Sequence, residues 1–124
     1  MIHLDTSALV DSLTGKRRSA RRFRQFVDNG ERLHLSALVL FEWLRGPRLP
    51  LEIKDQEDLF PADQTVAFGP AEALIAASVY RKIKRPRGRE IDIAIAACAI
   101  AHNATLWTLN PAHFKDIPNL GLVR

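Results

Sequence analysis

Cysteine is almost absent from this chain of 124 residues, where Cys98 is the single one. One cysteine excludes a disulfide framework and a zinc site built from cysteines, and it fits a reducing compartment. Long apolar runs are also missing, because the longest, residues 91–101, is shorter than the about 20 residues that span a bilayer. No basic leader precedes an apolar segment near the N-terminus, so we expect no membrane association and a cytoplasmic protein.

Proline and glycine are also few, at seven and six residues, and they form neither a low-complexity tract nor a linker. The hydrophobic content of 47% is that of an ordinary globular protein and excludes intrinsic disorder. Because the length is that of one domain, we expect a single domain over residues 1–124.

Positive charge is concentrated in two blocks. Residues 16–24 and 81–89 each contain six Lys and Arg and no acid, although the whole chain carries 18 cations and 14 acids. The rest of the chain is therefore strongly acidic. This division indicates a phosphate-bearing partner and a separate place where carboxylates gather.

Short apolar strand patterns alternate with helical patterns. We expect strands at 1–4, 33–35, 65–68, 105–109 and 120–123. Helices are expected from Asp5-Thr6-Ser7 onward and at 19–29, 36–45, 51–60, 71–83 and 90–102, with a turn or short helix at 111–114. Alternation of this kind predicts a three-layer α/β/α sandwich with a mainly parallel central sheet. Cys98 falls in the apolar 90–102 helix and is expected in the core.

Three acids are expected near the carboxyl edge of that sheet, where ligands bind. Asp5 follows the first strand, Asp92 begins the 90–102 helix, and Glu42 lies in an apolar helix. Asp5 and Asp92 could instead cap helices, and Glu42 could pair with Arg45. A pair on a helix surface explains an acid in apolar surroundings poorly, so the three acids favour a site for a hard metal ion.

Four segments in order resemble the motifs of PIN-domain nucleases, and the likeness is greatest to the VapC toxins of toxin–antitoxin pairs. They are Asp5–Leu9 after the first strand, 36–46 with Glu42, 92–102 with Asp92, and 108–114 with Asn110. The resemblance covers essentially the whole chain. It implies a PIN-like fold and a metal-dependent endoribonuclease that hydrolyses RNA phosphodiesters with Mg²⁺ or Mn²⁺.

The same resemblance implies the roles of the site residues. Asp5 and Asp92 would ligate the ion, Glu42 would bind through water or position the attacking water, and Asn110 would orient Asp5 or a ligand water. His113 stands where the fourth motif usually has a further Asp. It could ligate a metal, hold a metal-bound water, contact a phosphate, or be a surface histidine. Asn110 could also be only a turn residue before Pro111.

Hydroxyl and basic residues near the expected site are candidates for substrate binding. Thr6, Ser7 and Thr108 are hydroxyl donors that caps or strand structure would explain equally well. Arg85, Arg87 and Arg89 lie in a Pro- and Gly-containing loop just before Asp92 and are expected to bind the RNA backbone. The 16–24 block is expected to form a solvated helix face.

Family resemblance further implies a homodimer and a VapB-like antitoxin as partners. A candidate docking surface consists of apolar residues that could equally be core: Trp43, Leu44, Leu49, Leu51, Leu59 and Phe60. The alternative function is a PIN-fold module that binds RNA or a partner and has lost cleavage through His113. A dehalogenase-like phosphatase needs a second acid where Ser7 stands, and a receiver domain needs acids where His3 and Leu4 stand.

Overall fold

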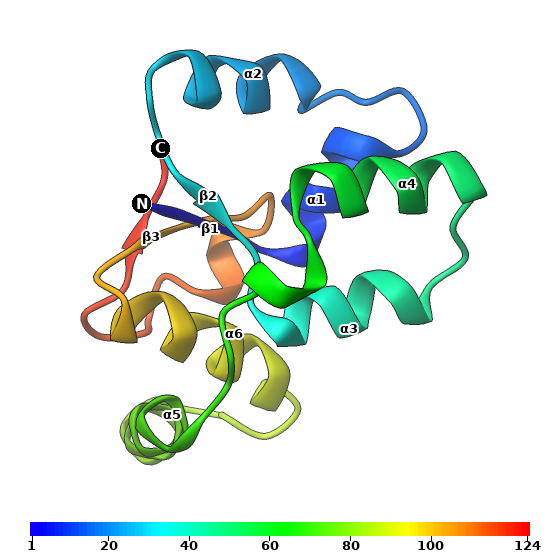
Figure 1. The fold of residues 1–124 in the computed structure, drawn as a ribbon. Helices are drawn as coiled ribbons and strands as arrows, with labels where there is room; N and C mark the ends of the chain where they lie inside the picture. The colour runs from blue at the N-terminus through cyan, green and yellow to red at the C-terminus, as the bar shows by residue number, and fades with distance from the viewer.

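A computed structural model describes all residues, 1–124, and contains one sheet of four strands (Figure 1). The strands are β1 (Ile2–Leu4), β2 (Leu33–His34), β3 (Thr105–Trp107) and β4 (Gly121–Leu122), in the order β2-β1-β3-β4. Every neighbouring pair is parallel, with Leu4 of β1 opposite Trp107 of β3. The expected parallel sheet is confirmed.

Six α-helices connect these strands: α1 (Thr6–Leu13), α2 (Ala20–Asp28), α3 (Ala37–Arg45), α4 (Pro50–Leu59), α5 (Pro70–Lys82) and α6 (Glu90–Ala101). Their starts follow local chemistry. The Ser36 hydroxyl accepts a hydrogen bond from the Val39 amide at 3.2 Å, and α4 and α5 begin at prolines. Short 3₁₀ helices occupy Ala62–Gln64 (η1) and Pro111–His113 (η2). No helix is long and apolar enough to cross a membrane.

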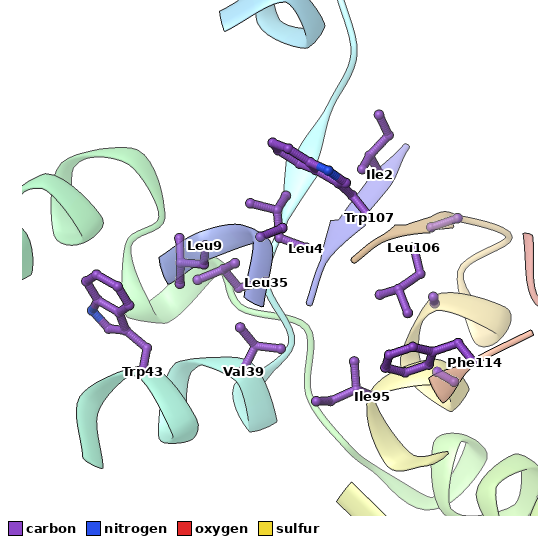
Figure 2. Close-up of a cluster of buried hydrophobic side chains, with 14 of the residues drawn as sticks. Ile2, Leu4, Leu9, Leu35, Val39, Trp43, Ile95, Leu106, Trp107 and Phe114 are labelled. Carbon is purple, nitrogen blue, oxygen red and sulfur yellow. The ribbon is translucent and has the colours of Figure 1, made fainter. Parts of the chain in front are cut away.

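Successive side chains of each short strand point to opposite faces of the sheet, and helices cover both faces. Leu4 and Trp107 lie on one face of the sheet, and Phe26 of α2 contacts the Trp107 ring edge-on at 5.1 Å (Figure 2). Leu106 lies on the other face, directed toward Ile95 of α6 (Figure 2). Helix α5 packs on the outside of α6 (Figure 1). The three-layer arrangement agrees with the sequence expectation.

Helix α6 is apolar on all sides because it lies between the sheet and α5. Residues 93–99 are all buried. Burial raises the pKa of the Cys98 thiol to about 12, so this cysteine is an unreactive core residue, as expected.

The expected strand at 65–68 is wrong. Only Val66 pairs with the sheet edge, through its amide to the Leu35 carbonyl and its carbonyl to the Ala37 amide, each at 2.8 Å. The segment runs parallel to the sheet edge at this one bridge and continues as coil from there to α5 (Figure 1). Phe68 is left exposed, and Pro70 then starts α5.

Candidate active site

Strand order places Asp5 beside Thr108. Strands β1 and β3 are neighbours in the middle of the sheet, and the chain leaves them toward different helices, which makes their carboxyl ends a topological switch point. Because Leu4 is paired with Trp107, the residues that follow them also meet. The Asp5 amide donates to the Trp107 carbonyl at 2.8 Å, and the Thr108 hydroxyl donates to Asp5 Oδ2 at 2.8 Å. Asp5 is buried there, only 6% exposed.

Two hydroxyl groups donate hydrogen bonds to the same oxygen of the Asp5 carboxylate. Ser7 Oγ donates to Asp5 Oδ2 at 2.9 Å and in turn accepts from the Leu109 amide at 3.0 Å. The Asn110 amide donates to Thr108 Oγ1 at 3.0 Å. Each hydroxyl that donates to Asp5 is therefore itself oriented by a backbone amide. Ser7 and Thr108, expected to face substrate, hold a carboxylate in place.

Glu42 reaches the same region from α3. Its Oε1 accepts from the Thr6 hydroxyl at 2.6 Å, and its Oε2 lies 3.2 Å from Arg45 Nη2. The expected Glu42–Arg45 pair is therefore present, but the Thr6 bond is the contact that ties Glu42 to the first turn of α1, next to Asp5. Thr6 thus positions an acid as well.

Asp92 lies in the first turn of α6 and completes an acidic cluster. Burial raises the pKa of Asp92, and the negative charges of Asp5 and Glu42 raise it further, while His113 and Arg89 act in the opposite direction. His113 Nδ1 lies 3.8 Å from Asp92 Oδ2. Asp92 therefore lies close enough to Asp5 and to Glu42 for their negative charges to act on its carboxyl group.

The donor set fits a hard divalent cation in its chemistry. Carboxylate oxygens that repel each other in a half-buried place are stabilised by a cation between them. No three His, Cys, Asp or Glu side chains stand close enough together to ligate one ion directly. Mg²⁺ keeps several waters and is commonly held by one or two carboxylates, so two acids of this set would be enough for such an ion.

In the fourth motif, residues 108–114, the side chains of Asn110 and His113 make fewer contacts with the acids than expected. The Asn110 side chain makes no hydrogen bond, is exposed, and does not orient Asp5; Thr108 does. His113 is also exposed, in η2, and the ionic contact of its side chain is with Asp92. It lies at the margin of the acidic cluster.

Arg89 is occupied by an ion pair that sequence reasoning missed. Its guanidinium contacts both oxygens of Asp116, at 2.9 and 2.6 Å, and donates to the His113 carbonyl at 2.9 Å. The bond from Arg89 lowers the pKa of Asp116. Arg89 therefore clamps the loop before α6 to the η2 segment, and of the three arginines expected to bind RNA, Arg85 and Arg87 remain exposed without an ionic partner. No pattern in the sequence links residues 89 and 116.

Of the residues expected to form a docking surface, some are buried in the core and the others are exposed. Trp43 and Phe60 belong to the core, at 0% and 6% exposure, and Arg48 stacks 4.3 Å above the Trp43 ring. Exposed apolar side chains remain on α3, α4 and the link between them: Phe41, Leu44, Leu49, Leu51 and Leu59. These five residues are called the leucine face below.

Known proteins share this chain's sequence and fold. Residues 2–120 match the PIN domain family. Ribonuclease VapC19 of Mycobacterium tuberculosis is 34% identical over 94% of both chains. Ribonuclease VapC1 of Methanocaldococcus jannaschii is 32% identical over 98% of this chain and 84% of its own length.

A solved structure confirms the fold. DNA-bound VapBC from Salmonella typhimurium superposes with a TM-score of 0.81 at 21% identity, covering 98% of this chain and 96% of the other. The chain belongs to the PIN domain family.

Proposed function

We propose that this protein is a metal-dependent endoribonuclease and the toxin of a toxin–antitoxin pair. The observation that carries the proposal is the convergence of Asp5, Glu42 and Asp92 at the switch point, with Asp5 held by two oriented hydroxyls. Relatives more than 30% identical over nearly the whole chain are named ribonucleases. The solved structure with the same fold is a VapBC complex.

Each acid has a role that follows from its contacts. Asp5 and Asp92 would hold a Mg²⁺ or Mn²⁺ ion, since they are the acids at the ends of β1 and at the start of α6. When bound, such an ion supplies positive charge at the phosphate and activates water. Glu42, fixed by Thr6 and Arg45, would orient the attacking water from the α3 side. His113 would contact a phosphate oxygen or a water next to Asp92.

Partners are proposed on the same grounds. The leucine face would receive a VapB-like antitoxin, because five apolar side chains near one another in the chain are left exposed there. Arg85 and Arg87 would contact the RNA backbone without reading bases. A homodimer and a cytoplasmic location complete the proposal.

Cleavage of structured RNA by the purified protein tests the proposal. With Mg²⁺ or Mn²⁺, Asp5→Ala and Asp92→Asn are expected to lower the rate at least about 100-fold, because removal of an ion ligand costs no less than removal of a supporting group. Asp63→Asn removes an exposed acid in η1 and is the matched control, with an unchanged rate expected. A chelator should abolish cleavage by the unaltered chain.

Calorimetric titration with Mn²⁺ separates the alternative function. The alternative, a PIN-fold module that binds RNA or a partner without cleavage, rests on His113 in the place of a fourth acid. Binding of Mn²⁺ that disappears in Asp5→Ala supports the nuclease. Equal cleavage by all variants would reveal a contaminating ribonuclease and end the claim.

A further inference from the structure

A cavity of about 730 Å³ opens beside Thr108, and neither the acids nor the leucine face uses it. Its apolar wall is formed by Trp107, Leu122 and Val123, at the ends of β3 and β4. Thr108 also lines it, and the same hydroxyl donates to Asp5 at 2.8 Å. One side chain therefore separates this cavity from the first predicted metal ligand.

Three guanidinium groups give the cavity a positive rim. Arg18 and Arg22 flank the start of α2, and Arg124 lies at the other side. None of the three forms an ion pair. The Asp11 carboxylate, which precedes this segment in the chain, accepts a hydrogen bond from Ser19 Oγ at 2.6 Å. The N-terminal end of α2 adds positive potential at this side of the rim.

We propose that this cavity is an RNA subsite, which binds a nucleotide next to the one whose phosphate lies at the acidic cluster. Arginine guanidinium groups suit phosphate oxygens, and an apolar wall suits a base or sugar. A volume of this size lies in the range of small-molecule pockets. The inference rests on the proposed nuclease function and gives part of the 16–24 block a role beyond a solvated face.

An acidic peptide would also satisfy guanidinium groups, but it has no need of the apolar wall between them. A strand of RNA offers both phosphate and base, and it must pass Asp5, which Thr108 connects to the cavity. RNA is therefore the occupant that uses every part of the lining.

Two double variants on the same short segment test the subsite. Arg18→Gln/Arg22→Gln changes the rim, and Arg21→Gln/Arg24→Gln removes the same charge from exposed positions of α2 outside the cavity. Both are made with Asp92→Asn, which prevents cleavage. The affinity for a labelled single-stranded 12-nucleotide RNA is measured by anisotropy at several salt concentrations.

The rim variant is expected to bind RNA at least about tenfold more weakly than the parent. The slope of log affinity against log salt concentration is expected to fall by about 1.4, because each of the two lost phosphate contacts contributes about 0.7. The control variant should change affinity less than about threefold. Fluorescence of Trp107, isolated by Trp43→Phe, should respond to RNA and lose that response in the rim variant. Equal losses of RNA affinity in the rim and control variants would overturn the proposal. Stronger binding of a hexaglutamate peptide than of the RNA would overturn it as well.

Cleavage assays distinguish this inference from the function on which it rests. With Asp92 restored, the rim variant should raise KM and leave kcat unchanged, since it removes binding shared by substrate and transition state. If the unaltered chain cleaves RNA and the two variants behave alike, the subsite fails and the nuclease stands. If the chain cleaves nothing while Trp107 still reports RNA through Arg18 and Arg22, the nuclease fails and the subsite stands.

Discussion

His3 is the most unusual single residue of the core. Its imidazole is 1% exposed, and neither ring nitrogen has a hydrogen-bond partner. The rings of His34 and His102 lie 6.1 and 5.7 Å away, so protonation would place positive charges together in a buried place. Burial first, then His102 and His34, lower the pKa of His3 to about 4. His3 is therefore neutral in the folded protein at neutral pH.

This neutrality predicts loss of stability in acid. Between pH 6.5 and about 4 the unfolded chain binds a proton at His3 that the folded chain does not, so the free energy of unfolding falls as pH falls through that window. One proton corresponds to about 1.4 kcal/mol per pH unit. In His3→Leu, urea unfolding followed from pH 7 to 4.5 should show a shallower decline by up to that slope. Parallel curves for both proteins would contradict this account.

The start of α6 is the element whose placement matters most, because it carries Asp92. The Arg89 clamp joins the residue that precedes α6 to Asp116 and to the carbonyl of His113. This contact connects the last loop of the chain with the helix that supplies an acid. We interpret it as a positioning contact for Asp92, and the distinction from an RNA contact is measurable.

Removing either partner of the clamp should have the same effect. Arg89→Gln and Asp116→Asn are each expected to reduce RNA cleavage severalfold and to cost no more than about 1 kcal/mol of stability, because the pair is exposed. Their double variant should be no worse than either single one. Were Arg89 an RNA contact, Asp116→Asn would leave cleavage unchanged or faster. Cleavage rates and thermal unfolding of the three variants decide between the two roles.

At the scale of the whole molecule, the leucine face is the feature that the single chain leaves unexplained. Leu49 and Leu51 are 65% and 62% exposed, beside one another at the start of α4. Leu74 is exposed to a similar degree, at 74%, on α5 (Figure 1). Several exposed apolar side chains close together in the chain, such as Leu49 and Leu51, favour a partner surface more than a single one such as Leu74 does.

Charge placed on the leucine face should block the antitoxin without affecting the nuclease. Leu49→Glu/Leu51→Glu is expected to abolish co-purification with the cognate antitoxin while stability changes by less than about 0.5 kcal/mol per exposed substitution. Leu74→Glu is the control and should retain the complex. Size-exclusion chromatography of co-expressed proteins gives the readout. Complex formation by both variants would place the antitoxin elsewhere on the surface.

Much of this molecule is predictable from local sequence patterns. Asp5 follows β1 and Asp92 lies in the first turn of α6, and a strand followed by cap residues, or a helix start, predicts such positions without knowledge of distant contacts. The Thr108–Asp5 bond depends on which strands are neighbours, and no local pattern reports that. The Arg89–Asp116 pair likewise joins two loops 27 residues apart.

Errors arose where burial depends on tertiary packing. Trp43 and Leu44 are adjacent in an apolar helix, yet the first is core and the second is half exposed. Residues 65–68 have strand composition, but the path from α4 to α5 leaves room for one bridged residue. Secondary-structure propensity is a property of a local segment. Whether that segment pairs with a sheet or is buried depends on how the rest of the chain packs around it.

The hydrogen bond from Thr108 to Asp5 spans 103 residues, and this separation sets when the site can form during synthesis. Strand β1 leaves the ribosome first, but its neighbour β3 and the Thr108 hydroxyl emerge only after most of the chain has been made. At about 5–20 residues per second, that delay is several seconds or more. During that time the first acid lacks both its sheet partner and its orienting donor. A nascent chain would therefore carry an incomplete site while it remains next to the RNA of its own ribosome.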